Sequence, residues 1–186
     1  MRKLILFNLI TLDGFFEGVN KELDWHNVDK EFNEFANEQL LSAGTLLFGR
    51  VTYELMASYW TTVSATEDDP IIAEKMNSFP KIVFSRTLKK ADWNNTKLVK
   101  ENIKEEVNKL KQQPGKDIFV MGSANLCSTL IQLNLIDEYR ITINPILLGK
   151  GNSLFKGLHD RLNLTLVKTK IFNSGKVLLY YEPKRP

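Results

Sequence analysis

The sequence has little of the chemistry that metals and disulfides need: one cysteine, Cys127, and two histidines, His26 and His159. A lone cysteine cannot form an intramolecular disulfide bond, and these three residues predict no metal-binding cluster. We therefore expect no metal site, and a reducing cytoplasm is consistent with this composition. Cys127 follows Leu126 on a predicted helix, so we interpret it as a small buried apolar side chain in preference to a nucleophile.

The chain also lacks an excess of either charge and any long apolar run. Its 25 Lys and Arg residues are interleaved with 22 Asp and Glu residues, which excludes the dense basic face that nucleic-acid binding needs. No apolar run approaches the roughly 18 residues of a membrane span. The first run is broken by Asn8 and followed by Asp13 and Glu17, which argues against a signal peptide. We expect a cytoplasmic protein with neither nucleic acid nor membrane as a partner.

What is present is an ordinary globular composition, with 43% hydrophobic and 25% charged residues in a chain of 186. This length suits one sizeable domain. No repeat, low-complexity tract or linker divides the chain, so we predict a single domain over residues 1–186.

The most informative stretch is 116–133, KDIFVMGSANLCSTLIQL. A run of apolar residues predicts a strand buried on both faces, and it stops at Gly122. Beyond the glycine, apolar residues at helical spacing predict a helix, with Ser123 and Asn125 at its start. Such a turn directs free backbone N–H groups and the positive end of the helix dipole at the carboxyl end of the strand, where an anion fits. A similar turn that binds nothing is at least as common, so this signal is weak alone.

Two further strand ends support the anion interpretation. Residues 45–48 predict a strand that runs into Gly49, Arg50 and Thr52 at the start of a second helix, where a guanidinium and a hydroxyl join the backbone donors. Residues 81–84 predict a third strand, which brings Ser85 and Arg86 to its end. An exposed turn with an unengaged arginine is the alternative explanation for the third site.

Three more helical segments are expected. Asn27 is the expected N-cap of a helix whose buried stripe is Val28, Phe32, Phe35 and Ala36. A polar, mobile loop is expected over 61–69, after which Asp69 and Pro70 cap and begin the next helix. Residues 101–112 predict a solvated surface helix.

The two ends of the chain predict strands. Residues 3–10 form a strand that leads into a loop at 11–18, whose Phe15 and Phe16 either cover a flat ring or pack into the core. Residues 139–144 alternate apolar and polar, which predicts a strand exposed on one side. Residues 153–158 suggest a turn of helix, and 162–172 with 177–181 predict a hairpin. The edges of these last strands lead us to expect a homodimer.

In this order the motifs resemble the dihydrofolate reductase fold, and more closely the C-terminal reductase domain of the bifunctional riboflavin-biosynthesis deaminase-reductase. The matching pieces are Thr11-Leu12-Asp13-Gly14, Phe48-Gly49-Arg50-x-Thr52-Tyr53-Glu54, Val83-Phe84-Ser85-Arg86, Phe119-Val120-Met121-Gly122-Ser123-Ala124 and Pro145-Ile146-Leu147-Leu148-Gly149-x-Gly151. The resemblance covers nearly the whole chain and implies a three-layer α/β fold, with a mostly parallel central sheet and a C-terminal antiparallel hairpin. The deaminase half, with its zinc-binding cysteines, has no counterpart here.

The resemblance implies NADPH as the cofactor and assigns it three groups of residues. The pyrophosphate would be held by Gly49, Arg50, Thr52, Gly122, Ser123, Ala124, Asn125 and Leu126. The 2′-phosphate would be held by Ser85 and Arg86, and the nicotinamide would be bordered by Leu12, Asp13 and Gly14.

The implied reaction is hydride transfer to a C=N or carbonyl carbon of a small substrate, a pteridine or a ribosylaminopyrimidine. The carboxylate that anchors the ring in dihydrofolate reductases corresponds to Glu31 or Asp29, and Glu31 and Asp13 are the candidate catalytic residues. A non-catalytic nucleotide-binding or regulatory module of the same fold is the alternative. The family's glycine pair is Gly122-Ser123 here, which favours the riboflavin-type domain over a folate enzyme.

Overall fold

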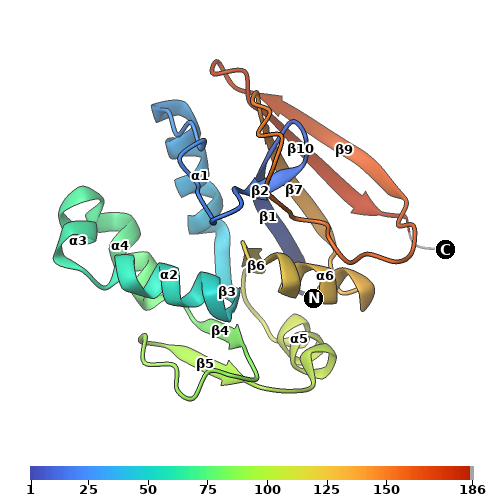
Figure 1. The fold of residues 1–186 in the computed structure, drawn as a ribbon. Coiled ribbons are helices and arrows are strands. Elements are labelled where there is room, and N and C mark those ends of the chain that lie inside the picture. The colour runs from blue at the N-terminus through green and yellow to red at the C-terminus, as the bar shows by residue number, and fades with distance from the viewer. Residues whose placement is uncertain (185–186) are drawn as a thin grey trace.

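A computed structural model describes residues 1–184, which fold around an eight-stranded sheet of order β5-β4-β3-β6-β1-β7-β10-β9. The strands from β5 to β7 pair in parallel, whereas β10 is antiparallel to both β7 and β9. The mostly parallel sheet with a C-terminal hairpin is thereby confirmed (Figure 1). The strands of this sheet are β1 (Leu4–Thr11), β3 (Ala43–Gly49), β4 (Lys81–Phe84), β5 (Thr96–Val99), β6 (Asp117–Met121), β7 (Glu138–Asn144), β9 (Leu164–Ile171) and β10 (Val177–Pro183).

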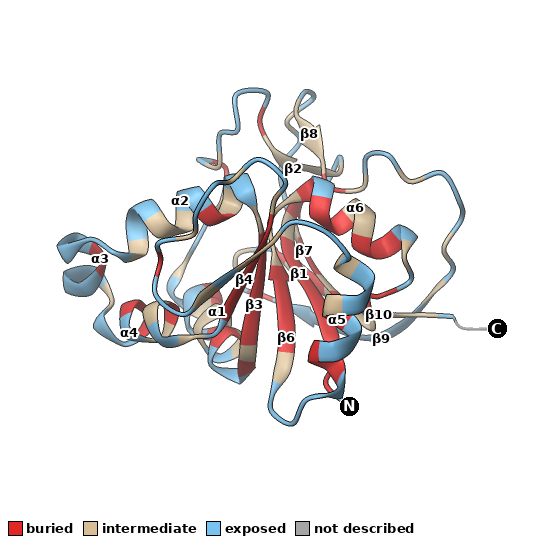
Figure 2. Cartoon of the chain, turned by 90° about the horizontal axis from the view of Figure 1, so that it is seen from below, coloured by how far each residue is buried: buried red, intermediate tan, exposed pale blue. Residues whose placement is uncertain are grey.

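Helices cover both faces of the sheet and create two apolar cores. On one face the core contains side chains of α1, α2 and α4, and on the other face side chains of α5 and α6. Figure 2 shows the buried strands between these two layers, with the outer helix surfaces exposed. The helices are α1 (Lys30–Ser42), α2 (Arg50–Trp60), α3 (Val63–Asp68), α4 (Pro70–Ser78), α5 (Ile103–Gln112) and α6 (Ala124–Gln132). None of the helices in the described part of the chain is long and apolar enough to cross a membrane.

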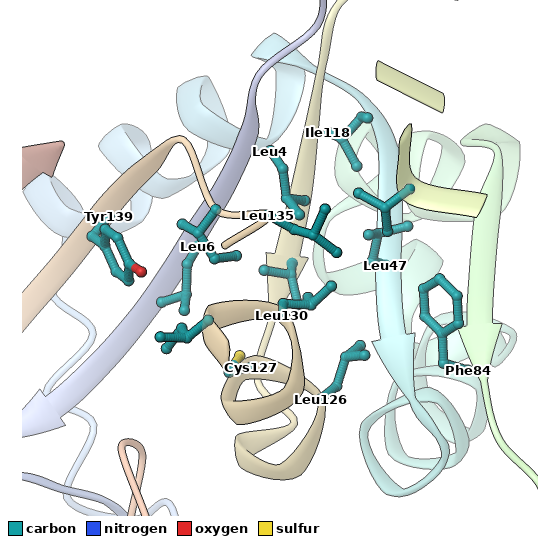
Figure 3. Close-up of a cluster of buried hydrophobic side chains, with 14 of the residues drawn as sticks. Leu4, Leu6, Leu47, Phe84, Ile118, Leu126, Cys127, Leu130, Leu135 and Tyr139 are labelled. Carbon is teal, nitrogen blue, oxygen red and sulfur yellow. The ribbon is translucent and has the colours of Figure 1, made fainter. Parts of the chain in front are cut away.

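Helix α6 is fixed on the sheet by the apolar stripe that its sequence predicts. Leu126, Cys127 and Leu130 are buried against side chains of β1, β3 and β6, among them Leu4 and Leu47 (Figure 3). Burial raises the pKa of the Cys127 thiol to about 12, so the side chain stays a protonated, apolar group as expected. The start of α6 is consequently held in a constant position at the carboxyl end of β6.

Two of the sequence expectations for helices are wrong. The N-cap of α1 is Asp29, whose carboxylate accepts a hydrogen bond from Phe32 N at 2.7 Å; Asn27 does not cap it, and Val28 lies outside the helix and is 53% exposed. The segment 61–69 is not an irregular loop, because it contains α3. Thr62 caps α3 by accepting from Ala65 N, and the burial of Ala65 anchors the helix.

Two expectations for strands are also wrong. Strand β7 is not exposed on one side: it lies between β1 and β10, and its polar residues Thr142 and Asn144 are buried. The free edge near the C-terminus therefore belongs to β9, not to β7. Residues 153–158 do not form a turn of helix. Their first residue ends β8 (Asn152–Ser153), which pairs with β2 (Phe15–Glu17) in a small second sheet.

Candidate functional site

A cleft of about 910 Å³ opens over the carboxyl ends of β3, β4, β5 and β6. Because parallel strands bring their following turns to the same edge of a sheet, segments far apart in sequence meet there. Nine of the residues predicted to bind a cofactor line this cleft: Gly49, Arg50, Thr52, Ser85, Arg86, Ser123, Ala124, Asn125 and Leu126. The three turns singled out in the sequence thus face one common space.

The helices that begin at this cleft lack the side-chain caps that the other helices have. The N-caps of α2, α5 and α6 are Gly49, Asn102 and Ser123, and none of them accepts a hydrogen bond from its own helix through a side chain. By contrast, α1, α3 and α4 are capped by the side chains of Asp29, Thr62 and Asp69. Backbone N–H donors of three helices, with the positive ends of their dipoles, therefore converge on the cleft, which favours an anionic ligand.

Ser123 joins the two glycine turns to each other. Its hydroxyl accepts a hydrogen bond from Gly49 N at 2.8 Å and donates one to Thr52 Oγ1 at 2.7 Å. A Cβ on Gly122 would lie 2.9 Å from Thr52 Oγ1, and one on Gly49 would lie 2.9 Å from Ser123 Oγ. Gly122 also has φ of +62°, which disfavours other residues. The space beside Gly122 is thus filled by Thr52, and the glycine allows two turns to approach each other.

The cleft is basic. Its lining includes six basic side chains and two acidic ones, which are Lys21, Arg50, Arg86, Lys100, Lys104 and Lys156 against Glu17 and Glu101. Arg50 forms an ion pair with Glu54, with Nη1 2.9 Å from Oε2, and both side chains are partly exposed. Ser85 is engaged in its own turn, since its hydroxyl accepts from Thr87 N and Leu88 N.

Sequence reasoning missed the residues that follow β5. Lys100, Asn102 and Lys104 line the cleft beside Arg86, and Asn102 takes a left-handed conformation at the start of α5. The strand before them, Thr96–Val99, is short and only partly buried, so it carries no clear apolar signal. The available signal was Lys100 directly after this strand and Lys104 in the first turn of the helix.

The other predicted residues lie outside the lining of the cleft. Gly122 is behind its surface, and Leu12 is 63% exposed on the neighbouring loop with Asp13 and Gly14. The Asp13 carboxylate accepts hydrogen bonds from Thr11 Oγ1 at 2.6 Å and Gly149 N at 2.8 Å, and the hydrogen bond from Thr11 contributes most to lowering its pKa. Asp13 therefore ties two loops together.

The carboxylates at the start of α1 also have structural partners. Glu31 Oε2 accepts from the backbone N of Asn173 at 2.9 Å. Asp29 caps α1 and lies 3.4 Å from Lys176 Nζ. The structure thus brings none of Asp13, Asp29 and Glu31 into the cleft, and it gives each one a bond that holds the fold.

A second, smaller cavity of about 380 Å³ lies further along α2, between α1, α2 and α4. Its floor is formed by Phe7 of β1 and by Phe119 and Met121 of β6. Met121 directly precedes Gly122, so the floor of this cavity ends where the turn into α6 begins. Helix α2 contributes Thr52 to the large cleft and Met56 to the small cavity, which places the two sites next to each other.

Comparisons with known proteins agree with this architecture. The family described as the RibD C-terminal domain matches residues 2–178. The "Uncharacterized protein YyaP" of Bacillus subtilis (strain 168) is 41% identical over 182 residues, 97% of this chain and 94% of that protein. The crystal structure of a putative riboflavin biosynthesis protein from Shewanella sp. PV-4 superposes with a TM-score of 0.75 at 25% identity, covering 98% of this chain and 99% of the other.

A more distant structure shares the fold. It is a diaminohydroxyphosphoribosylaminopyrimidine deaminase/5-amino-6-(5-phosphoribosylamino)uracil reductase from Thermotoga maritima, with a TM-score of 0.71 at 16% identity. The match covers 98% of this chain and 57% of that one.

Proposed function

This chain belongs to the RibD C-terminal domain family, and from that membership we propose that it is an NADPH-dependent reductase of a pyrimidine or pteridine-type ring. The observation that carries the proposal is the convergence of three helix N-termini without side-chain caps on one basic cleft. A cofactor with several phosphate groups supplies the anions that such a cleft favours.

The lining residues fit the two kinds of phosphate group in NADPH, the pyrophosphate and the 2′-phosphate. The N–H groups at the starts of α2 and α6, together with Arg50, would hold the pyrophosphate. Arg86, at the end of β4, would hold the 2′-phosphate, with Lys100 and Lys104 at the end of the neighbouring strand β5. Arginine suits this role because its planar guanidinium can donate two parallel hydrogen bonds to a phosphate.

When bound, NADPH supplies the hydride for reduction of a C=N or carbonyl carbon. The protein contributes position: Ser123 and Thr52 fix the two cofactor turns relative to each other, and Met121 links the second turn to the floor of the smaller cavity. The apolar side chains of that cavity exclude water from a ring bound there. Asp13, Asp29 and Glu31 each accept a hydrogen bond from another segment of the chain, and none of the three lines the large cleft.

That same observation favours a second candidate function, a nucleotide-binding module that does not turn over. It retains every feature of the large cleft and needs no proton donor.

Incubation with NADPH or NADH, alone and with candidate rings, separates the two functions. The rings are dihydrofolate, 5-amino-6-ribosylaminouracil and its 5′-phosphate, and the readouts are NADPH absorbance and an equilibrium titration. A reductase binds NADPH and consumes it with at least one ring. Binding without consumption with any ring supports the module, and no binding of either nucleotide contradicts both.

A further inference from the structure

We propose that the smaller cavity binds the reducible ring and selects a ring without a phosphate group, either neutral or positively charged. The inference rests on the proposed function for the reaction that follows binding. The binding itself is a property of the cavity and can be measured without the cofactor. This preference for a ring without phosphate would distinguish the chain from a reductase whose substrate carries a phosphoribosyl group.

The shape of the cavity suits a flat ring. Phe7, Phe119 and Met121 form an apolar floor on the sheet, and Met56 and Trp60 of α2 form one wall. The facing walls are also apolar and consist of Ala36, Leu40, Ile72 and Met76. A volume of about 380 Å³ is at the lower end of the range for small-molecule sites and accommodates a one- or two-ring heterocycle.

The polar side chains of the cavity are acceptors and amides. They are Asn33, Asn37, Tyr59, Asp68 and Asp69, and among the described lining residues there is no Lys, Arg or His. Asp68 Oδ2 accepts from the Tyr59 hydroxyl at 3.1 Å, while Asp69 accepts from Ile72 N at 3.1 Å and lies 3.4 Å from Asn37 Nδ2. Two carboxylates are thus held at the rim by neighbouring groups.

A basic group near the floor is already engaged. The Arg140 guanidinium lies 5.3 Å from the centroid of the Phe119 ring, where it contributes a cation–π contact. Its Nε is 2.6 Å from Glu138 Oε1, and its Nη1 donates to Gln39 Oε1. Because Arg140 is outside the lining and paired with a carboxylate, it does not compensate a negative charge inside the cavity.

The charge pattern decides between substrates. A phosphate ester bound in this cavity would bring about −1.5 to −2 charges at neutral pH close to Asp68 and Asp69, with no cation among the described lining residues to pair with. A neutral ring meets amides that can donate and accept, and an amino-substituted cationic ring gains attraction from the two carboxylates. The large cleft has the opposite charge pattern, because six basic side chains outnumber two acidic ones in its lining.

The test compares two probes that differ only in the phosphate: 5-amino-6-ribosylaminouracil and its 5′-phosphate. Calorimetric titration of the wild-type protein without cofactor gives an affinity for each. We expect the unphosphorylated compound to bind at least tenfold more tightly. Asp68→Lys, which places a cation at the rim, should improve binding of the phosphate at least tenfold. Asp92→Lys makes the same charge change at an exposed position outside the cavity lining and should leave both affinities unchanged.

The outcomes are unambiguous. Equal or tighter binding of the phosphate by the wild-type protein overturns the proposal, as does no binding of the unphosphorylated probe. Failure of Asp68→Lys to improve phosphate binding more than Asp92→Lys does also overturns it. Failure of the proposed function has a different signature, since NADPH would then neither bind nor be oxidised while the preference of the cavity between the probes persisted.

Discussion

Gly122 and Gly14 both have positive φ, +62° and +85°, but their surroundings differ. A Cβ on Gly14 would meet nothing within 4 Å, whereas one on Gly122 would contact Thr52. We predict that Gly14→Ala costs only the left-handed strain, about 1–2 kcal/mol of unfolding free energy. Gly122→Ala should cost a further 1–3 kcal/mol, roughly, for overpacking, and should lower NADPH affinity. Urea denaturation measures the unfolding free energies of the two variants.

Thr52 provides the control for this prediction. Thr52→Ala alone already lacks the hydrogen bond from Ser123, so it is the reference for the Gly122→Ala/Thr52→Ala double variant. Relative to Thr52→Ala, the added Gly122→Ala should cost no more than Gly14→Ala costs in the wild type, because the overpacking is relieved while the strain remains. Equal stabilities of Gly14→Ala and Gly122→Ala single variants would contradict the close approach of the two turns.

At this scale the sequence predicts residues whose chemistry is local and misses those whose partners are distant. Gly49, Arg50 and Ser123 lie where a strand passes into a helix, and their positions could be predicted from the pattern. The role of Glu31 depends on Asn173, a residue 142 positions away, and Asp13 contacts Gly149 at a separation of 136. No local pattern predicts such contacts, so the sequence does not reveal the structural bonds that these two carboxylates make.

Among the elements, the turns before α2 and α6 act as a pair through Ser123. We predict that Ser123→Ala destabilises the protein by about 1–3 kcal/mol, because it removes the acceptor for Gly49 N and the donor to Thr52 Oγ1. NADPH binding should weaken in parallel as the turns separate. Ser58→Ala is the control, since Ser58 only donates to Leu55 O on the exposed side of α2. Similar stabilities of the two variants would show that the turns are independent.

The C-terminus of α4 is closed by a buried lysine. Lys81 Nζ donates to the carbonyl oxygens of Met76, Asn77 and Phe79, and desolvation lowers its pKa from 10.5 to about 8. Between these pH values the unfolded chain binds more protons than the folded protein, so stability rises with pH. We predict that the unfolding free energy of the wild type increases by up to about 3 kcal/mol relative to Lys81→Met from pH 8 to 10.5.

The comparison with Lys81→Met is needed because other groups titrate nearby. Burial raises the pKa of Cys127 and of Tyr139, which removes stability as the pH rises above about 9, but both groups are present in both proteins. The difference between the two stability curves therefore isolates Lys81. A difference that stays flat from pH 8 to 10.5 would contradict the lowered pKa.

Elements with a continuous apolar run were predicted, and those stabilised by distant pairing were not. The runs of β3, β4 and β6 and the stripe of α6 are explicit in the sequence. The strands β2 and β8 are three and two residues long, and each is stabilised by pairing with the other. The alternation of polar and apolar residues in β7 predicted one exposed face. In the structure β7 lies between two neighbouring strands, and some of its polar residues are buried.

For the whole molecule, the described sheet ends in an edge strand, β9, with exposed apolar side chains. Ile171 is 73% exposed, and Leu166 and Val167 are about half exposed. An unpaired edge of this kind favours pairing with another strand, and a second copy offers the same edge in the antiparallel orientation. We predict a dimer in analytical ultracentrifugation, and a monomer for Ile171→Lys. Val63→Lys, at an equally exposed position on α3, should remain dimeric. A monomeric wild type would contradict this prediction.

The central claim is that the large cleft binds a nicotinamide dinucleotide and recognises its 2′-phosphate. The most direct test is an equilibrium titration of NADPH and NADH into three proteins: the wild type, Arg86→Ala and Arg50→Ala. We predict saturable NADPH binding by the wild type. Arg86→Ala should weaken NADPH binding about tenfold to a hundredfold and change NADH binding little, because a charge-assisted hydrogen bond is lost only with NADPH. Arg50→Ala should weaken the binding of both nucleotides. Equal losses for the two nucleotides in Arg86→Ala, or no uptake of either nucleotide by the wild type at millimolar concentration, would contradict it.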